Sequence, residues 1–177
     1  MLKEIREWVV TIVVALVVVF LVRQFLLTQF VVDGASMAPT FIDGDRVFVS
    51  KVSYKMHDVE HGDIVVFDNK EGEAYIKRVI GVPGDDVKMV DKEVYVNGER
   101  IDERYVSYKG NSYLDNFELS DLGVNGEIPE GQYLVLGDNR PVSKDSRQFG
   151  LIEDDQIIGK VFLRFWPFSE ISNDFSD

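Results

Sequence analysis

An apolar, uncharged run, WVVTIVVALVVVFLV, covers residues 8–22, and after Arg23 and Gln24 it resumes as FLL up to Leu27. At about 1.5 Å of helix rise per residue, residues 8–27 match the roughly 30 Å hydrocarbon layer of a bilayer. The run is apolar on every face, which argues against a buried core helix, and it is too long for a strand. We therefore expect a transmembrane anchor at 8–27, preceded by a short tail at 1–7.

The main alternative to an anchor is a cleavable signal peptide, because Lys3 and Arg6 resemble the basic start of one. No small-x-small cleavage site follows the run promptly, and the bulky sequence QFVVD stands there instead. Basic residues before a span favour a cytoplasmic N-terminus. We therefore expect a single-pass protein of the cell membrane, with residues 28–177 on the extracytoplasmic side.

Charge and cysteine content exclude several classes of function. The net charge is −12 and lysine and arginine form no cluster, which argues against binding of nucleic acid through its phosphates. Cysteine is absent, so disulfides, thiolate chemistry and cysteine-type zinc sites are excluded.

Beyond residue 27, apolar and polar residues alternate in short segments, which is typical of half-buried strands. Asn97-Gly98 predicts a type I′ hairpin turn, and Asp91-Lys92 predicts another turn. No later segment keeps a helical period over three turns, so we expect a mainly β domain. We interpret the polar, poorly patterned residues 103–130 as a surface insertion with little role in chemistry. The expected strands are 46–52, 63–67, 74–81, 86–90, 93–101, 132–137 and 159–165.

One motif suggests a metal and is rejected on its context. His57-Asp58-Val59-Glu60-His61 matches the H-x-x-E-H pattern of some zinc proteases, whose two imidazoles must project from one face of a helix. Here His61 is followed at once by Gly62-Asp63 and a β-branched run, which indicates a turn that enters a strand. We expect no metal site.

The segment GASMAPT places Ser36 between Gly34 and Pro39, just after the apolar run. A serine hydroxyl is a weak nucleophile and needs a base within hydrogen-bond reach. His57 and His61 qualify by residue type only. Lys77 is the other candidate, because strand alternation places it on an apolar face with Tyr75 and Val79, where desolvation would lower its pKa. From spacing alone, an ordinary solvent-facing lysine is an equally open interpretation.

Four segments follow one another along the chain: GASMAPT (34–40), HGDIVVF (61–67), YIKRVIGVPGD (75–85) and GDNRPVSKDSRQFG (137–150). Together they resemble the bacterial type I signal peptidases, which use a Ser/Lys dyad, and the glycine at position 34 is similar to the Gram-positive branch. The resemblance covers nearly the whole chain after the apolar run and implies a signal-peptidase-like β fold. The fourteen-residue last segment is the most specific of the four.

The resemblance implies a role for each matching residue. Ser36 attacks the scissile carbonyl, and its backbone N–H is one oxyanion donor. Lys77 in its neutral form takes the hydroxyl proton, and Ser143 hydrogen-bonds and orients its amine. Some members carry a hydroxyl residue where this chain has Gly34, so the second oxyanion donor is open. Arg78 supports the lysine strand, and Asp145 with Arg147 form a structural pair. Shallow pockets for an Ala-x-Ala motif are lined by Phe30, Val32, Met37, Phe41, Tyr75 and Ile76.

The expected function is removal of signal peptides from exported preproteins at the surface of the lipid bilayer, with no cofactor. Phe30, Val31 and Phe41 are expected to touch the interface. Two alternatives stay open on the residues alone. One is a self-cleaving Ser/Lys regulatory protease, and the other is a membrane-tethered binding domain without catalysis.

Overall fold

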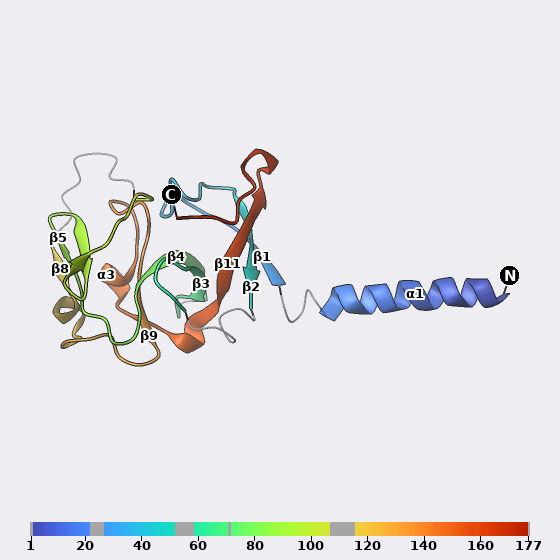
Figure 1. Cartoon of the computed structure of the whole chain (residues 1–177), viewed down its shortest axis with the longest axis horizontal. Helices are drawn as coiled ribbons and strands as arrows, with labels where there is room; N and C mark the ends of the chain where they lie inside the picture. The colour runs from blue at the N-terminus through green and yellow to red at the C-terminus, as the bar shows by residue number, and fades with distance from the viewer. Residues whose placement is uncertain (1, 22–26, 52–58, 71, 107–115, 177) are drawn as a thin grey trace.

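The computed structural model describes residues 2–21, 27–51, 59–70, 72–106 and 116–176. Helix α1 (Leu2–Leu21) stands apart from the strands in Figure 1. Within the described ranges, no helix combines the length and apolar character needed to cross a membrane. Leu27, the expected last residue of the anchor, instead begins strand β1 (Leu27–Val31). The span at 8–27 therefore stays a prediction.

The strands form two antiparallel sheets, which confirms a mainly β domain. The larger sheet has the order β1-β2-β11-β3-β4-β9-β10 and the smaller one β7-β6-β5-β8. The smaller sheet lies at the end of the body farthest from α1 (Figure 1). The bounds of the other elements are β2 (Arg46–Ser50), β3 (Ile64–Asp68), β4 (Ala74–Gly81), β5 (Val87–Val90), β6 (Glu93–Val96), β7 (Glu99–Arg100), β8 (Phe117–Glu118), η2 (Leu119–Leu122), β9 (Gln132–Leu136), α3 (Ser146–Phe149), β10 (Ile152–Glu153), η3 (Asp154–Gln156), β11 (Ile157–Trp166) and η4 (Phe168–Glu170).

All seven expected strands are present, and 93–101 is split into β6 and β7 by its predicted turn. Asn97 and Gly98 have φ of 54° and 82°, as a type I′ turn requires. Asp91 and Lys92, which join β5 to β6, also have a left-handed backbone conformation, with φ of 50° and 72°. Strands β1, β8 and β10 were not predicted.

Strand β4 lies between β3 and β9 in the larger sheet, and its second half is buried. Because side chains alternate along a strand, Tyr75, Lys77 and Val79 share one face. Lys77 pairs with Val65 of β3, which belongs with Val79 to one buried cluster. The predicted apolar surroundings of Lys77 are thus confirmed.

The interpretation of 103–130 as a mere surface insertion is wrong for its described part. Phe117, Leu119 and Ile128 are buried in the core of the smaller sheet, where β8 pairs with β5. Tyr105 is also buried, and its ring stacks on the Arg78 guanidinium at 3.7 Å. These few apolar residues are widely spaced, so they form no periodic pattern, and they become core only through long-range pairing.

Candidate active site

Ser36 lies in the turn that follows β1, and the turn is fixed by backbone contacts. The Gly34 N–H donates to Asp43 Oδ1 at 2.8 Å, and Gly34 has φ of +86°, a conformation that favours glycine. The carbonyls of Ala35 and Ser36 accept hydrogen bonds from the side chain and backbone of Asn139, each at 3.0 Å. Among the described residues, none accepts a hydrogen bond from the Ser36 N–H.

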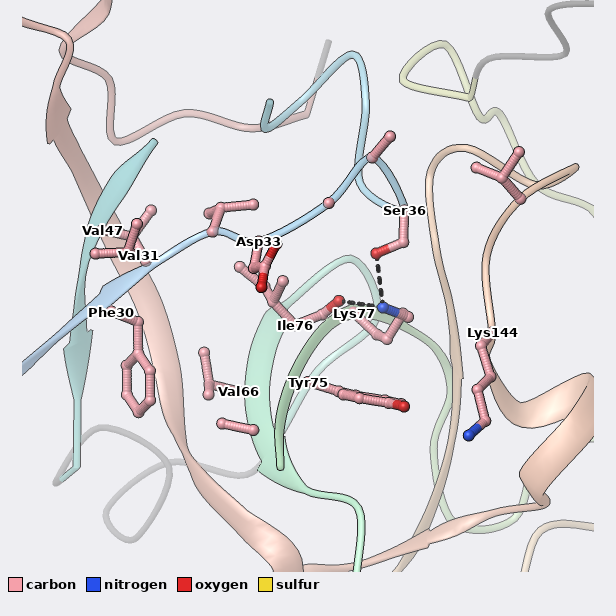
Figure 2. A pocket seen from close by; sticks show the side chains of 15 residues that line it. Phe30, Val31, Asp33, Ser36, Val47, Val66, Tyr75, Ile76, Lys77 and Lys144 are labelled. Carbon is pink, nitrogen blue, oxygen red and sulfur yellow. Dashed lines mark hydrogen bonds between the residues drawn. The ribbon is translucent and has the colours of Figure 1, made fainter. Parts of the chain in front are cut away.

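The Lys77 amine meets the Ser36 hydroxyl directly. Its Nζ donates to Ser36 Oγ at 2.8 Å and to the Ile76 carbonyl at 2.8 Å (Figure 2). The Lys77 side chain is 4% exposed, and its Nζ lies 5.3 Å from the centre of the Tyr75 ring. The sequence hypothesis that these two groups meet is therefore supported by geometry.

Burial sets the protonation of the Lys77 amine. It lowers the pKa from 10.5 to about 8, and the carboxylates of Asp145 and Asp138 oppose this shift. At pH 7 roughly a tenth of such an amine is neutral, against about one in three thousand for an unperturbed lysine. A buried amine near neutrality, within reach of a hydroxyl, can act as its general base.

A buried charge network lies behind Lys77. Arg78, the next residue of β4, donates from Nε and Nη2 to the two carboxylate oxygens of Asp138 at 2.9 and 2.8 Å. Thr40, at the end of the Ser36 turn, also donates to this carboxylate. The network joins the Ser36 turn to β4, and the supporting role of Arg78 for the lysine strand stays a prediction.

The expected pair of Asp145 and Arg147 is present. Nε and Nη2 of Arg147 each donate to the Asp145 carboxylate at 2.8 Å. Asp145 also accepts from the Gly137 N–H at 3.0 Å, and Arg147 Nη2 donates to the Arg140 carbonyl at 2.9 Å. The pair therefore closes the loop between β9 and α3 next to Ser36.

Ser143 does not make its expected hydrogen bond. Its side chain is buried, and its Oγ has no hydrogen-bond partner among the described residues. The Lys77 amine donates to Ser36 and to the Ile76 carbonyl instead. Ser143 nevertheless lies close to the Ser36 turn. Both border Gly137 so tightly that a Cβ added there would clash with Ser143 Oγ and with the Ser36 carbonyl oxygen.

A cavity of about 450 Å³ opens beside the Ser36–Lys77 pair, and Figure 2 shows the side chains that line it. Four of the six predicted pocket residues line it: Phe30, Val32, Tyr75 and Ile76. Met37 and Phe41 do not, which corrects the prediction. Both are completely buried in the core beneath the Ser36 turn, because the turn directs them inward. The remaining lining residues are Val31, Asp33, Gly34, Ala35, Val47, Val66, Ala74, Val142 and Lys144.

The expected turn at His61 is confirmed. Residues 61 and 62 form a turn before β3, and His61 Nε2 lies 2.6 Å from Asp85 Oδ2. His57 lies outside the described residues. Among the described residues, no group of three histidine, cysteine or acidic side chains could hold a metal ion.

Three contributors to the site were not predicted individually: Thr40, Asp138 and Asn139. Thr40 ends the segment GASMAPT, and Asp138-Asn139 follow the first glycine of GDNRPVSKDSRQFG. What could have indicated them is that each is a polar residue inside a segment that resembles the family. The segments say that these residues belong near the site, but not which partners they bind.

Comparison with known proteins agrees with this geometry. A family model described as signal peptidase, peptidase S26, matches residues 5–166. Signal peptidase IB of Staphylococcus aureus (strain COL) is 49% identical over 185 aligned residues, which cover 99% of this chain and 97% of the relative. Signal peptidase I of Bacillus caldolyticus is 41% identical over 150 residues, which cover 82% of each chain.

A solved structure gives the same result. The crystal structure of a signal peptidase I from Enterococcus faecalis V583 superposes with a TM-score of 0.52 at 36% identity, covering 59% of this chain and 97% of that one. The chain therefore belongs to the signal peptidase family, peptidase S26.

Proposed function

We propose that this protein is a serine endopeptidase that removes N-terminal signal peptides from exported preproteins, with Ser36 as nucleophile and Lys77 as general base. The observation that carries this proposal is the 2.8 Å contact between a buried, partly neutral amine and the Ser36 hydroxyl, beside an apolar cavity. The proposed reaction needs no metal and no cofactor.

In the proposed mechanism the neutral Lys77 amine accepts the hydroxyl proton as Ser36 Oγ bonds to the scissile carbonyl carbon. The Ser36 N–H, which has no acceptor among the described residues, stabilises the oxyanion. The protonated amine then gives its proton to the leaving nitrogen as the C–N bond breaks. A water, deprotonated by Lys77, finally hydrolyses the acyl-enzyme and releases Ser36.

The apolar cavity supports a preference for small substrate side chains. Phe30, Val32 and Ile76 line it with half-buried or buried side chains, close to Ser36. A large residue adjacent to the cut would clash with this wall, whereas alanine would fit. We infer cleavage after Ala-x-Ala-like sites.

The membrane placement belongs to the same proposal. Residues 8–27 would anchor the chain with its N-terminus in the cytoplasm, so that the cavity lies at the outer surface where signal peptides emerge. Tethering both partners to one bilayer raises their effective concentration. Val31 at the cavity rim is 57% exposed and fits lipid contact. Phe41 does not, because it is fully buried, which corrects that expectation.

The test is cleavage of an exported preprotein added in trans to the full-length chain in detergent. Ser36→Ala and Lys77→Met should each abolish cleavage. Lys88→Met is the matched control, because Lys88 lies in β5 of the other sheet, and it should cleave like the wild type. Near-normal turnover by Lys77→Met would refute the dyad. Cleavage of the chain itself, with none of the preprotein, would instead indicate a self-cleaving regulator.

A further inference from the structure

The turn that carries Ser36 is supported from beneath by two buried side chains. Met37 and Phe41 are both 0% exposed, and the Phe41 N–H donates to the Met37 carbonyl at 2.9 Å. Ser36 directly precedes Met37, so the position of Phe41 and its neighbours constrains the position of the nucleophile. The side chains that pack against Phe41 therefore affect the 2.8 Å contact between Ser36 Oγ and Lys77 Nζ.

The C-terminal segment supplies that packing. After β11 and η4 the chain returns along β11, and Arg164 and Ser172 exchange backbone hydrogen bonds at 2.8 and 3.2 Å. This return places the Phe175 ring 4.9 Å from the Phe41 ring, with Phe175 half-buried against the same core cluster as Met37. The end of the chain thus lies directly under the nucleophile turn.

Arg164 joins the two segments through its guanidinium. Nη1 donates to the Thr40 carbonyl at 2.8 Å and lies 3.4 Å from Asp45 Oδ2, while Nε donates to the Glu170 carbonyl at 2.8 Å. The Arg164 side chain is only 14% exposed. Thr40 is therefore held through its carbonyl by Arg164 and through its hydroxyl by Asp138.

We infer that Arg164 and Phe175 are positioning residues for the Ser36 nucleophile, which they act on through Thr40 and Phe41. The inference rests on the proposed function of Ser36. Neither residue lines the cavity or contacts the Lys77 amine. Their loss should therefore slow the chemical step without weakening substrate binding or changing the base. Because a displacement of about 1 Å can cost about a hundredfold in rate, a partial shift of the turn should cost about tenfold.

The test compares Phe175→Ala with Phe175→Leu, which keeps most of the apolar contact, and with Phe168→Ala. Phe168 is the matched control, since it lies on the same C-terminal segment and is 71% exposed. We expect Phe175→Ala to lower kcat about tenfold with KM and the acidic limb of the pH profile unchanged. Phe175→Leu should recover most of kcat, and Phe168→Ala should match the wild type. Arg164→Ala should behave like Phe175→Ala.

A second readout is the rate at which a serine-reactive acylating inhibitor labels Ser36, measured by intact mass on variants shown to be folded by circular dichroism. Phe175→Ala should be labelled about tenfold more slowly than the wild type. Equal kcat and labelling rates in folded Phe175→Ala and wild type would overturn the positioning role, but would leave the proposed function of Ser36 intact. A loss of kcat that merely tracks the unfolded fraction would also overturn it. A wild-type chain that neither cleaves nor is labelled would refute the proposed function itself.

Discussion

Replacing Lys77 by methionine should abolish activity and yet stabilise the folded protein at neutral pH. The native state holds this amine at a pKa of about 8, whereas the unfolded chain returns it to about 10.5. At about 1.4 kcal/mol per pKa unit, protonating the buried amine at pH 7 costs the native state roughly 3 kcal/mol. Methionine avoids this cost but loses the hydrogen bonds to Ser36 and the Ile76 carbonyl, a loss of about 1 kcal/mol. The expected net gain is about 2 kcal/mol.

The pH dependence of this gain has a definite sign. The folded pKa lies below the unfolded one, so between about pH 8 and 10.5 the unfolded chain binds more protons, and wild-type stability rises with pH. The advantage of Lys77→Met should therefore be full below about pH 8, fall to zero between about pH 9.5 and 10, and approach a deficit of about 1 kcal/mol above about pH 10.5, where only the lost hydrogen bonds remain.

The assay is urea unfolding followed by circular dichroism at pH 7 and pH 10, in the same detergent for both proteins. Lys88→Met serves as control, because Lys88 is half-buried in the smaller sheet and its loss should change stability by less than about 1 kcal/mol, with no change between the two pH values. A Lys77→Met variant that is less stable than the wild type at pH 7 would refute the reasoning. So would a stability difference that does not change between the two pH values.

Two further predictions concern the groups around the dyad. Asp138→Asn should destabilise the protein by about 3–5 kcal/mol in urea unfolding, because it leaves the buried Arg78 guanidinium uncompensated; a loss below about 1 kcal/mol would show that the pair is not needed. Gly137→Ala should reduce cleavage by about tenfold or more, because its Cβ would clash with Ser143 Oγ and with the Ser36 carbonyl oxygen and so displace the nucleophile turn. Normal turnover by Gly137→Ala would show that Ser143 and the Ser36 carbonyl do not lie this close to Gly137.

The seven expected strand segments could be predicted from sequence because they depend on local patterns. Alternation fixed the face of β4 on which Lys77 lies, and positive-φ residue types at Asn97-Gly98 marked the hairpin. The pairing of Ser36 with Lys77 was inferred from the resemblance of four segments, spread over residues 34–150, to a known family.

The rest depends on contacts between distant segments. Met37 and Phe41 resemble pocket residues in sequence, but the direction of a side chain in a turn follows no alternation, and both turned out to be core. Phe117 belongs to a strand of two residues that exists only because it pairs with β5. Phe175 and Phe41 are far apart in sequence but in contact in the fold, and no local pattern indicates that the two residues are partners.

The central claim is that a neutral Lys77 amine is the base that activates Ser36, and the pH dependence of kcat/KM for preprotein cleavage tests it most directly. Since the amine titrates at about 8, kcat/KM should rise about tenfold per pH unit below that value and level off above it. A limb with its midpoint at about pH 6.5, where an ordinary histidine titrates, would contradict the account.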